Sequence, residues 1–418
     1  MSLPNRGALY GERYRVIVST DIGGSDPDDF QSMVHYLLYS DIFDTEGLIS
    51  SPWGEGRVSD ILTVIDAYEQ DYPNLIRHSD NYPTPDYLRS ITKQGAIDIA
   101  PYKGYAESTP GSQLIIDCAK KEDDRPLYIL AWGLLEDIAQ ALHDAPEIID
   151  KIRVNYIGGP NKKWGLNAYE YILREFPDLW MIEDNSTYRG WFNGGNMEGD
   201  LGNQSFVLEH AKGHGALGDF FATQLGSVIK MGDTPTVSWL FDGNPEEPET
   251  DSMGGRFERV WNRPHRTYHR NTTKEDIVEI FEVIEFVFDG PVMDKSPEEL
   301  EKEVFFHMVV DNQRFDGYYC GDGQYKVRFM PKSLGDWEYV LESDIPELNG
   351  QSGQFVSVPE AGENRRDKGQ NLKNWWADTL APEDAEGVHM GAKTVNRYRE
   401  VYLRDFAARF DRCYCTTL

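Results

Sequence analysis

Residues 15–38 read RVIVSTDIGGSDPDDFQSMVHYLL, and this segment carries the clearest structural signal in the chain. The apolar run from Arg15 to Thr20 predicts a β-strand, and the apolar residues from Phe30 onward recur at helical spacing. Between them lies an acidic loop that contains Asp21, Asp26, Asp28 and Asp29. A strand that leads through a loop into a helix is the repeating unit of α/β proteins, so this segment predicts that class of fold.

The same pattern occurs twice more along the chain. PLYILA, residues 126–131, leads into the helical pattern LLEDIAQAL, and IRVNYI, residues 152–157, leads through a Gly-Gly turn towards a helix near Asn167 to Glu175. Alternating strands and helices predict a mostly parallel sheet flanked by helices. Because such sheets bind ligands at the carboxyl ends of their strands, the acidic loop, Trp132 and the Gly158-Gly159 turn are expected at one edge.

The pattern changes after about Thr273. Short β-rich runs such as VFFHMVV, YKVRFM, WEYVL and QFVSV alternate with Gly-, Asn- and Asp-containing turns, which predicts a smaller β-sandwich module. Helical spacing returns in KTVNRYREVYLRDFAARF, residues 393–410. We therefore expect an α/β domain of residues 10–272 plus 388–418, an inserted β-sandwich module of residues 274–360 and a linker of residues 361–387.

The chain of 418 residues carries 41 basic and 71 acidic side chains, a formal net charge of −30. This charge opposes binding to nucleic acid or to an anionic membrane, and it favours neutral or cationic partners. We expect a soluble chain, because no apolar run reaches membrane-spanning length and the N-terminus lacks the apolar core of a signal peptide; its localisation stays open. The four cysteines match neither a disulfide framework nor a zinc site and are expected to be free thiols: Cys118, Cys320, Cys413 and Cys415.

The acidic loop is the candidate site. Several carboxylates in one short loop repel one another, and a hard divalent cation with about six to eight oxygen ligands relieves that repulsion. Gly23 and Gly24 allow the backbone to curve around the ion, and calcium fits better than zinc because no His or Cys lies nearby in the sequence. The alternative is that Asp28 or Asp29 caps the helix that begins at Phe30, which explains one aspartate and involves no metal.

Three segments, in order, resemble motifs of nucleoside hydrolases. VIVSTDIGGSDPDDFQSM resembles the aspartate motif of that family, AWGLLEDIA its second calcium-loop motif, and IRVNYIGG its Met-Gly-Gly strand. RPLYILAWG, GDTPTVSWLF, DSMGGRFERVW and RDFAARFDR resemble the nucleoside-hydrolase-like domain of proteins described as cellulose-binding. FDGYYCGDGQYKVRFMPKSLGDWEYVL resembles a β-sandwich module found beside glycoside hydrolases.

The resemblance implies a nucleoside-hydrolase-like fold and a calcium-dependent hydrolase of glycosidic bonds, N-ribosyl or related. By position, it implies that Asp21, Asp29 and the backbone carbonyl of Trp132 bind calcium, and that Asp28 holds a sugar hydroxyl. Asp251 is the candidate for the last calcium ligand, with Asp242 and Glu249 as rivals. In the reaction, Asp21 or Asp28 would take the proton of the attacking water.

Other residues are expected to bind the substrate. Asn167 matches the asparagine that binds the sugar in the resembled family, and Trp164 and Trp191 lie among Gly, Asn and Lys residues, where their rings could stack on sugar faces. The acid that protonates the leaving group stays open among three candidates: Glu170, Glu183 and Tyr188.

Ser19 stands where nucleoside hydrolases have their first aspartate, and no histidine lies near Asp251 in the sequence, so we expect a sugar substrate other than a nucleoside. The main alternative is a non-catalytic carbohydrate-binding protein, with cellulose-like ligands, in which calcium braces a loop. A phosphotransferase with Asp21 as nucleophile is disfavoured, because the loop offers a phosphate no cationic cradle. The expected ligand is a small glycoside or a polysaccharide, and the sequence is compatible with a homo-oligomer.

Overall fold

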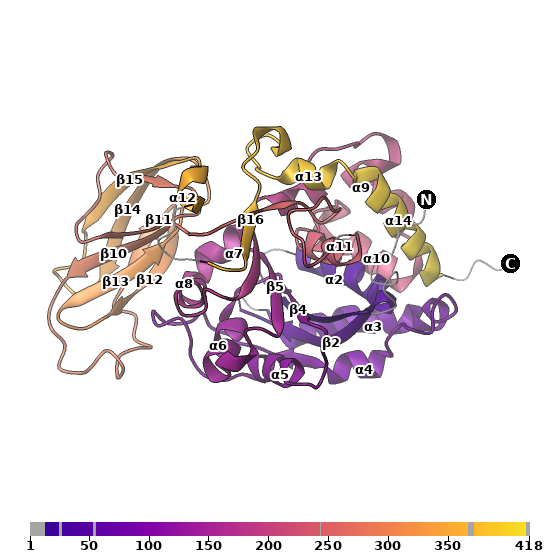
Figure 1. Cartoon of the computed structure of the whole chain (residues 1–418), viewed down its shortest axis with the longest axis horizontal. Helices are drawn as coiled ribbons and strands as arrows, with labels where there is room; N and C mark the ends of the chain where they lie inside the picture. Colours follow the sequence, from indigo (N-terminus) through magenta and orange to yellow (C-terminus); the bar gives the residue numbers. More distant parts are fainter. Residues whose placement is uncertain (1–12, 25–26, 53–55, 243, 367–371, 415–418) are drawn as a thin grey trace.

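The computed structural model describes residues 13–24, 27–52, 56–242, 244–366 and 372–414. Figure 1 shows an α/β body, coloured indigo to magenta, with a smaller β-module in orange at one end. The C-terminal helices, in yellow, lie back on the body. The chain therefore leaves the body, forms the module and returns, which confirms the predicted architecture of an α/β fold with an inserted β-sandwich.

An eight-stranded sheet forms the centre of the body, in the order β3-β2-β1-β4-β5-β6-β16-β7. Neighbouring strands are parallel from β3 to β16, and β7 joins antiparallel at the edge. The strands are β1 (Tyr14–Thr20), β2 (Phe43–Ser50), β3 (Thr92–Gln94), β4 (Leu127–Ala131), β5 (Ile152–Ile157), β6 (Trp180–Asp184), β7 (Phe257–Arg259) and β16 (Trp375–Asp378). Every residue of β4 and of β6 is buried, as expected for parallel strands covered on both faces.

Helices cover both faces of this sheet. Val16 and Val18 of β1 pack in one core with α2, α3, α10, α11 and α14, whereas Ile17 between them packs in a second core with α5, α6 and α8. This follows from the period of two along a strand. The helices are α2 (Asp28–Leu38), α3 (Val58–Leu75), α4 (Pro85–Ser90), α5 (Pro110–Ala119), α6 (Glu136–Asp144), α7 (Gly159–Trp164), α8 (Leu166–Glu175), α9 (Asn203–Phe206), α10 (Gly215–Thr223), α11 (Thr234–Asp242), α12 (Gly362–Arg366), α13 (Ala392–Asn396) and α14 (Arg399–Phe410).

The β-module is a curled eight-stranded sheet in the order β8-β10-β13-β12-β11-β14-β15-β9. Buried and more exposed residues alternate along β13 and β15, so one face of each strand packs inward. That inward face builds an aromatic core around Phe286, Phe329 and Phe355. The strands are β8 (His265–Tyr268), β9 (Ile277–Glu279), β10 (Val283–Asp289), β11 (Phe306–Val310), β12 (Gln313–Tyr319), β13 (Gln324–Phe329), β14 (Gly335–Ser343) and β15 (Ser352–Val358).

Two segments differ from the expected boundaries. Residues 361–387 were expected to form a linker, but Trp375–Asp378 form β16, which is buried between β6 and β7. The run is only four residues long, too short for a strand period to stand out in the sequence. At the other end, β8 lies before residue 272 and pairs with β10 of the module.

A buried ionic network joins the module to the body. Glu183 of β6 accepts hydrogen bonds from Lys162 (2.9 Å) and Arg263 (2.8 Å), and Lys162 also donates to the carbonyl of Phe281 at the base of the module (2.9 Å). Burial alone would raise the pKa of Glu183, but Arg263 and Lys162 hold it well below its ordinary value. Nearby, the ring of Trp164 stacks on Phe315 of β12, with centroids 5.1 Å apart.

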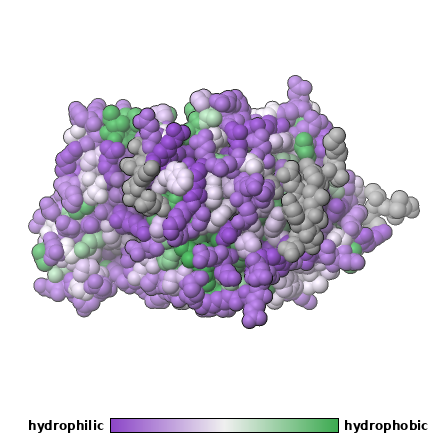
Figure 2. All heavy atoms as spheres, viewed as in Figure 1, coloured by the Kyte–Doolittle hydropathy of each residue, from purple (hydrophilic) through white to green (hydrophobic). Residues whose placement is uncertain are grey.

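The face of the molecule in Figure 2 is mainly hydrophilic, with small apolar patches. Among the described residues, no helix combines the length and apolarity that crossing a membrane requires. Cys118, Cys320 and Cys413 are free, and Cys415 lies outside the described residues.

We predict that Glu183→Gln lowers the free energy of unfolding by about 3–5 kcal/mol, because it leaves Lys162 buried without its counter-charge and Arg263 with Glu360 alone. Chemical denaturation measures the change. The control is Lys373→Ala, which removes an exposed ion pair with Asp178 and should cost less than about 1 kcal/mol. Equal effects of the two variants would contradict the prediction.

Candidate functional site

A cavity of about 280 Å³ lies at the carboxyl ends of β1, β4 and β5. Its size is near the lower end of the range for small-ligand sites, roughly 300–1,000 Å³. Its polar wall is made of four carboxylates, three cations and several neutral groups from segments far apart in the sequence. They are Asp21, Asp28, Asp29, Asp233, Arg189, Lys230, Lys332, Asn161, Tyr188, Trp164, Trp132 and Gly232.

The acidic loop delivers three of the carboxylates. Asp21 follows β1, and Asp28 and Asp29 form the first turn of α2, where the unpaired backbone N–H groups favour negative charge. Thr20 donates a hydrogen bond to Asp29 (2.5 Å), and the backbone N–H of Gly232 donates to Asp28 (3.0 Å). The N-cap position of α2 is Pro27, which makes no side-chain capping bond, so capping does not account for Asp28 or Asp29.

Asp233 is the fourth carboxylate and was not among the predicted site residues. It immediately precedes α11, is 4% exposed, and its Oδ2 has no hydrogen-bond partner among the described residues. Burial raises its pKa well above the ordinary value, and the negative charges of Asp29, Asp28 and Asp21 raise it further. The available sequence signal was an aspartate directly before a helix start, in the segment GDTPTVSWLF.

The carboxylates of the cavity lack sufficient counter-charge. Burial, followed by the charge of Asp29, raises the pKa of Asp28 to about 7. Burial also raises the pKa of Asp29 to about 6, against hydrogen bonds from Thr20 and Asp21 that lower it. The pKa of Asp21 lies well above its ordinary value, because of burial first and of Asp29 second. Such a group takes up protons unless a cation neutralises it.

The donor set fits a hard cation. It consists of carboxylate oxygens, one of them without a partner, and of the Trp132 carbonyl, which accepts a hydrogen bond from Asn161 (2.7 Å) and keeps a second lone pair. Oxygens around calcium, at about 2.3–2.6 Å from the ion, lie up to about 5 Å apart. No three of the four described carboxylates have oxygens all within 4.8 Å of one another, so a bound ion would draw them inward or reach one through water.

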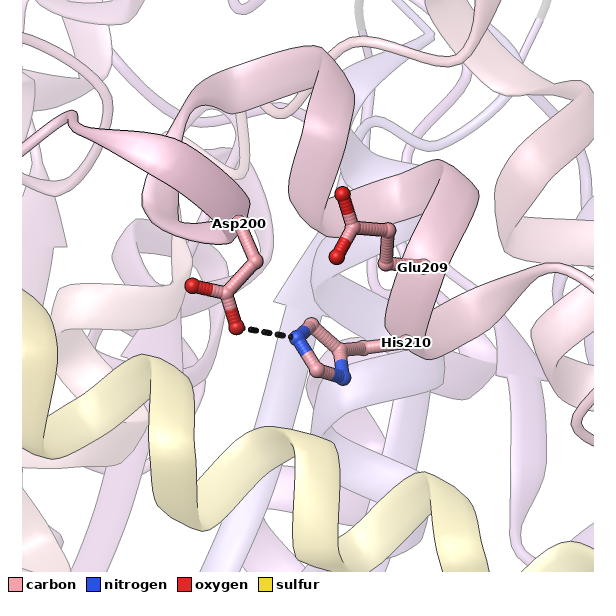
Figure 3. A group of neighbouring side chains, drawn as sticks. All are labelled: Asp200, Glu209 and His210. Atoms are coloured by element: carbon pink, nitrogen blue, oxygen red, sulfur yellow. Dashed lines mark hydrogen bonds and ion pairs between the residues drawn. The ribbon is translucent and has the colours of Figure 1, made fainter.

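A second group, Asp200, Glu209 and His210, does place its ligand atoms within 4.8 Å in the described part of the chain (Figure 3). However, Asp200 is already paired with His210 (2.8 Å) and with the two terminal guanidinium nitrogens of Arg404. These bonds lower the pKa of Asp200 and neutralise its charge, which distinguishes this group from the cavity.

Of the residues predicted to bind the substrate, some line the cavity and others lie elsewhere in the structure. Trp164 lines the cavity, whereas Trp191 is fully buried in the body, stacked on Tyr402 with ring centroids 3.7 Å apart. Asn167 lies at the contact with the module, where it donates to the carbonyl of Ala100 (3.1 Å) and accepts from Arg328 (3.1 Å). Asn161, six residues earlier, lines the cavity instead.

The predicted last calcium ligand is also elsewhere. Asp251 is exposed and lies near Arg256 (3.8 Å) and Arg397 (3.7 Å). Of its rivals, Asp242 accepts a hydrogen bond from the backbone of Met253, and Glu249 is exposed. None of the three lines the cavity, whereas Asp233 does.

Of the three candidate acids, only Tyr188 lines the cavity. Glu183 belongs to the buried network, and Glu170 is buried between Arg174 and His265. Burial raises the pKa of Tyr188 above its ordinary value, so its hydroxyl remains protonated. Asp26 of the acidic loop lies outside the described residues.

The mostly parallel sheet with helices on both faces and the acidic cavity at its strand ends agree with the nucleoside-hydrolase-like fold expected from the sequence. The chain belongs to the family described as "Cellulose-binding Sde182, nucleoside hydrolase-like domain", whose model matches residues 15–257. A second model, a domain of unknown function (DUF5060), matches residues 277–344 in the module. A comparison with curated proteins found no match.

Solved structures include a nucleoside hydrolase-related hypothetical protein from Saccharophagus degradans that is associated with carbohydrate metabolism. It is 20% identical, with a TM-score of 0.50, over 83% of this chain and 100% of its own, and so supports the fold. The inosine-uridine preferring nucleoside hydrolase of Bacillus anthracis is 15% identical over 60% of this chain and 86% of its own, with a TM-score of 0.38. A putative glycoside hydrolase from Bacteroides vulgatus is 29% identical over 22% of this chain and 17% of its own, with a TM-score of 0.18.

We predict that Gly133→Ala destabilises the protein by about 1–3 kcal/mol, because the position beside Asp21 has no room for a side chain. An added Cβ would lie 2.3 Å from Ser51 Oγ and 2.8 Å from the backbone nitrogen of Asp21. Gly362→Ala is the matched control, since its Cβ would meet only Leu380, at 3.6 Å, and its effect should stay within about 1 kcal/mol. Thermal unfolding of the two variants checks the prediction, and a neutral Gly133→Ala would contradict it.

Proposed function

We propose that this protein is a calcium-dependent hydrolase of glycosidic bonds. The observation that carries the proposal is the convergence of four buried carboxylates on one cavity, with an oxygen of Asp233 left without a partner. The fold family and the carbohydrate association of the Saccharophagus relative support a sugar as the ligand.

In this proposal Asp21, Asp29, Asp233 and the carbonyl of Trp132 hold calcium. Asp233 takes the role expected of Asp251, since it lines the cavity and lacks a counter-charge. When bound, calcium supplies positive charge that orients sugar hydroxyls and makes a water more acidic. The raised pKa values of the cavity carboxylates support this assignment, because a bound cation would stabilise their charged forms.

The remaining polar groups bind substrate and move the proton. Asp28 lies at the cavity wall and holds a sugar hydroxyl, and Asp28 or Asp21 accepts the proton of the attacking water. Asn161 replaces Asn167 as the amide that contacts the sugar, and Trp164 offers an aromatic surface to its ring. Trp191 has no part in this site, because it is fully buried.

A non-catalytic carbohydrate-binding protein is the second candidate. The observation that favours it is the shortage of a leaving-group acid. Apart from the four carboxylates, Tyr188 is the uncharged acid among the described residues that line the cavity. Its raised pKa makes its hydroxyl a weak proton donor. The description of the family as cellulose-binding agrees with this alternative.

We predict that chelator-treated protein binds one calcium ion and that Asp29→Asn and Asp233→Asn each abolish the binding. Asp251→Asn, which changes an exposed carboxylate outside the cavity, should bind as the wild type does. Calorimetry measures the binding. At a calcium concentration 100-fold above Kd, the bound ion should also add about 2.7 kcal/mol to the free energy of unfolding. Retained binding in Asp233→Asn, or loss in Asp251→Asn, would contradict this ligand assignment.

We also predict that Asp28→Asn lowers kcat/KM on a hydrolysed aryl glycoside by about 10²–10⁴-fold, because it removes a group that accepts a proton and holds the sugar. Calcium binding to this variant, measured in parallel, controls for loss of the metal. Calcium-dependent sugar binding without turnover in the wild type would favour the non-catalytic alternative.

A further inference from the structure

The cavity contains three cations that the proposed reaction does not use. Arg189 follows β6, Lys230 lies shortly before α11, and Lys332 lies in the module, just after β13. These positions are up to 143 residues apart in sequence (189 to 332), so the folded structure alone brings them together. Lys230 lies in the same segment as Asp233, whereas Arg189 and Lys332 come from segments that carry none of the four carboxylates.

Pairing with the acidic cluster accounts for only one of the three cations in the described structure. Lys230 lies 3.5 Å from Asp28. Arg189 and Lys332, by contrast, form no ion pair with any carboxylate among the described residues. Burial and then the charge of Arg189 lower the pKa of Lys332, so the two like charges repel each other in the cavity that both residues line. A negatively charged ligand group near both side chains would offset that repulsion.

The negative net charge of the whole chain opposes the binding of an anion, so a group of cations in one cavity is unexpected. A protein with a formal charge of −30 repels an anion at long range, and only local cations can reverse that field at the cavity. Once the carboxylates hold a divalent cation, the three basic side chains exceed the negative charge that remains in the wall. This excess of positive charge therefore rests on the proposed calcium site.

Through Lys332, the β-module contributes a side chain to the cavity. The loop after β13 reaches the cavity because the module is fixed to the body by the hydrogen bond from Lys162 to the Phe281 carbonyl and by the stacking of Phe315 on Trp164. Trp164 itself lines the cavity. The module thus completes the cavity wall.

We propose that the site selects an anionic saccharide, a glycoside that bears a carboxylate or a sulfate near the scissile bond, and that Arg189 and Lys332 bind this group. The planar fork of Arg189 suits an oxyanion, and Lys332 adds a point charge from the module. Neutral cellulose-like chains lack such a group and bind more weakly.

The test uses the full chain loaded with calcium on an array of oligosaccharides in matched sets, each with a neutral hexose, its uronic acid and its 6-sulfate. Calorimetry on the best set then gives affinities. We expect an acidic member to bind at least about tenfold more tightly than its neutral partner, and Lys332→Ala to remove about tenfold of that preference. The neutral affinity should change less than about twofold.

Two further variants serve as controls for the charge and the position of Lys332. Lys332→Arg should keep the preference, and Lys295→Ala, which removes an exposed lysine of the same module outside the cavity, should change nothing. The uronate and sulfate members show which oxyanion is preferred.

The inference is overturned if neutral members bind as tightly as acidic ones, if Lys332→Ala behaves like Lys295→Ala, or if no set binds although calcium does. Failure of the proposed function would appear separately, as absence of calcium binding in the same sample.

Discussion

Carboxylates buried side by side repel one another, and this cavity holds four of them between β1, α2 and α11. Hydrogen bonds from Thr20 and from the backbone of Gly232 stabilise Asp29 and Asp28, but an oxygen of Asp233 has no partner in the described structure. The raised pKa values follow from this shortage of positive charge. A cation that neutralises the cluster would therefore stabilise the fold and prepare the site at once.

The second constraint is the attachment of the β-module. Lys162 belongs to α7, just after β5, and its ammonium binds both Glu183 in the central sheet and the Phe281 carbonyl of the module. This pairing, together with the stacking of Trp164 on Phe315, holds the loop of Lys332 at the cavity. The module is thus positioned to affect ligand selection rather than to act only as a separate binding unit.

Much of the fold could be predicted because its signals are local. The alternation of strand and helix, and the change to short β-rich runs after about Thr273, are visible in neighbouring residues. The sequence did not predict β2, β3, β6 and β7 of the central sheet, nor the strands β16 and β8. The last two are short, and their place depends on partners far away: β16 pairs with β6 and β7, and β8 with β10 of the module. Burial of both faces of β16 by the body is a property of the assembled sheet, not of the four residues themselves.

By itself, the sequence determined the α/β class, the inserted module and the placement of Asp21, Asp28, Asp29 and Trp132 at one edge, because residues that end parallel strands or begin the next helix meet there. Only the tertiary structure decided that Asp233 and not Asp251 joins them, that Asn161 and not Asn167 faces the cavity, and that Trp191 is core. It also decided that Lys332 of the module reaches the site. These residues lie in loops and helix ends whose direction depends on packing between segments far apart in sequence, and no local periodicity records that packing.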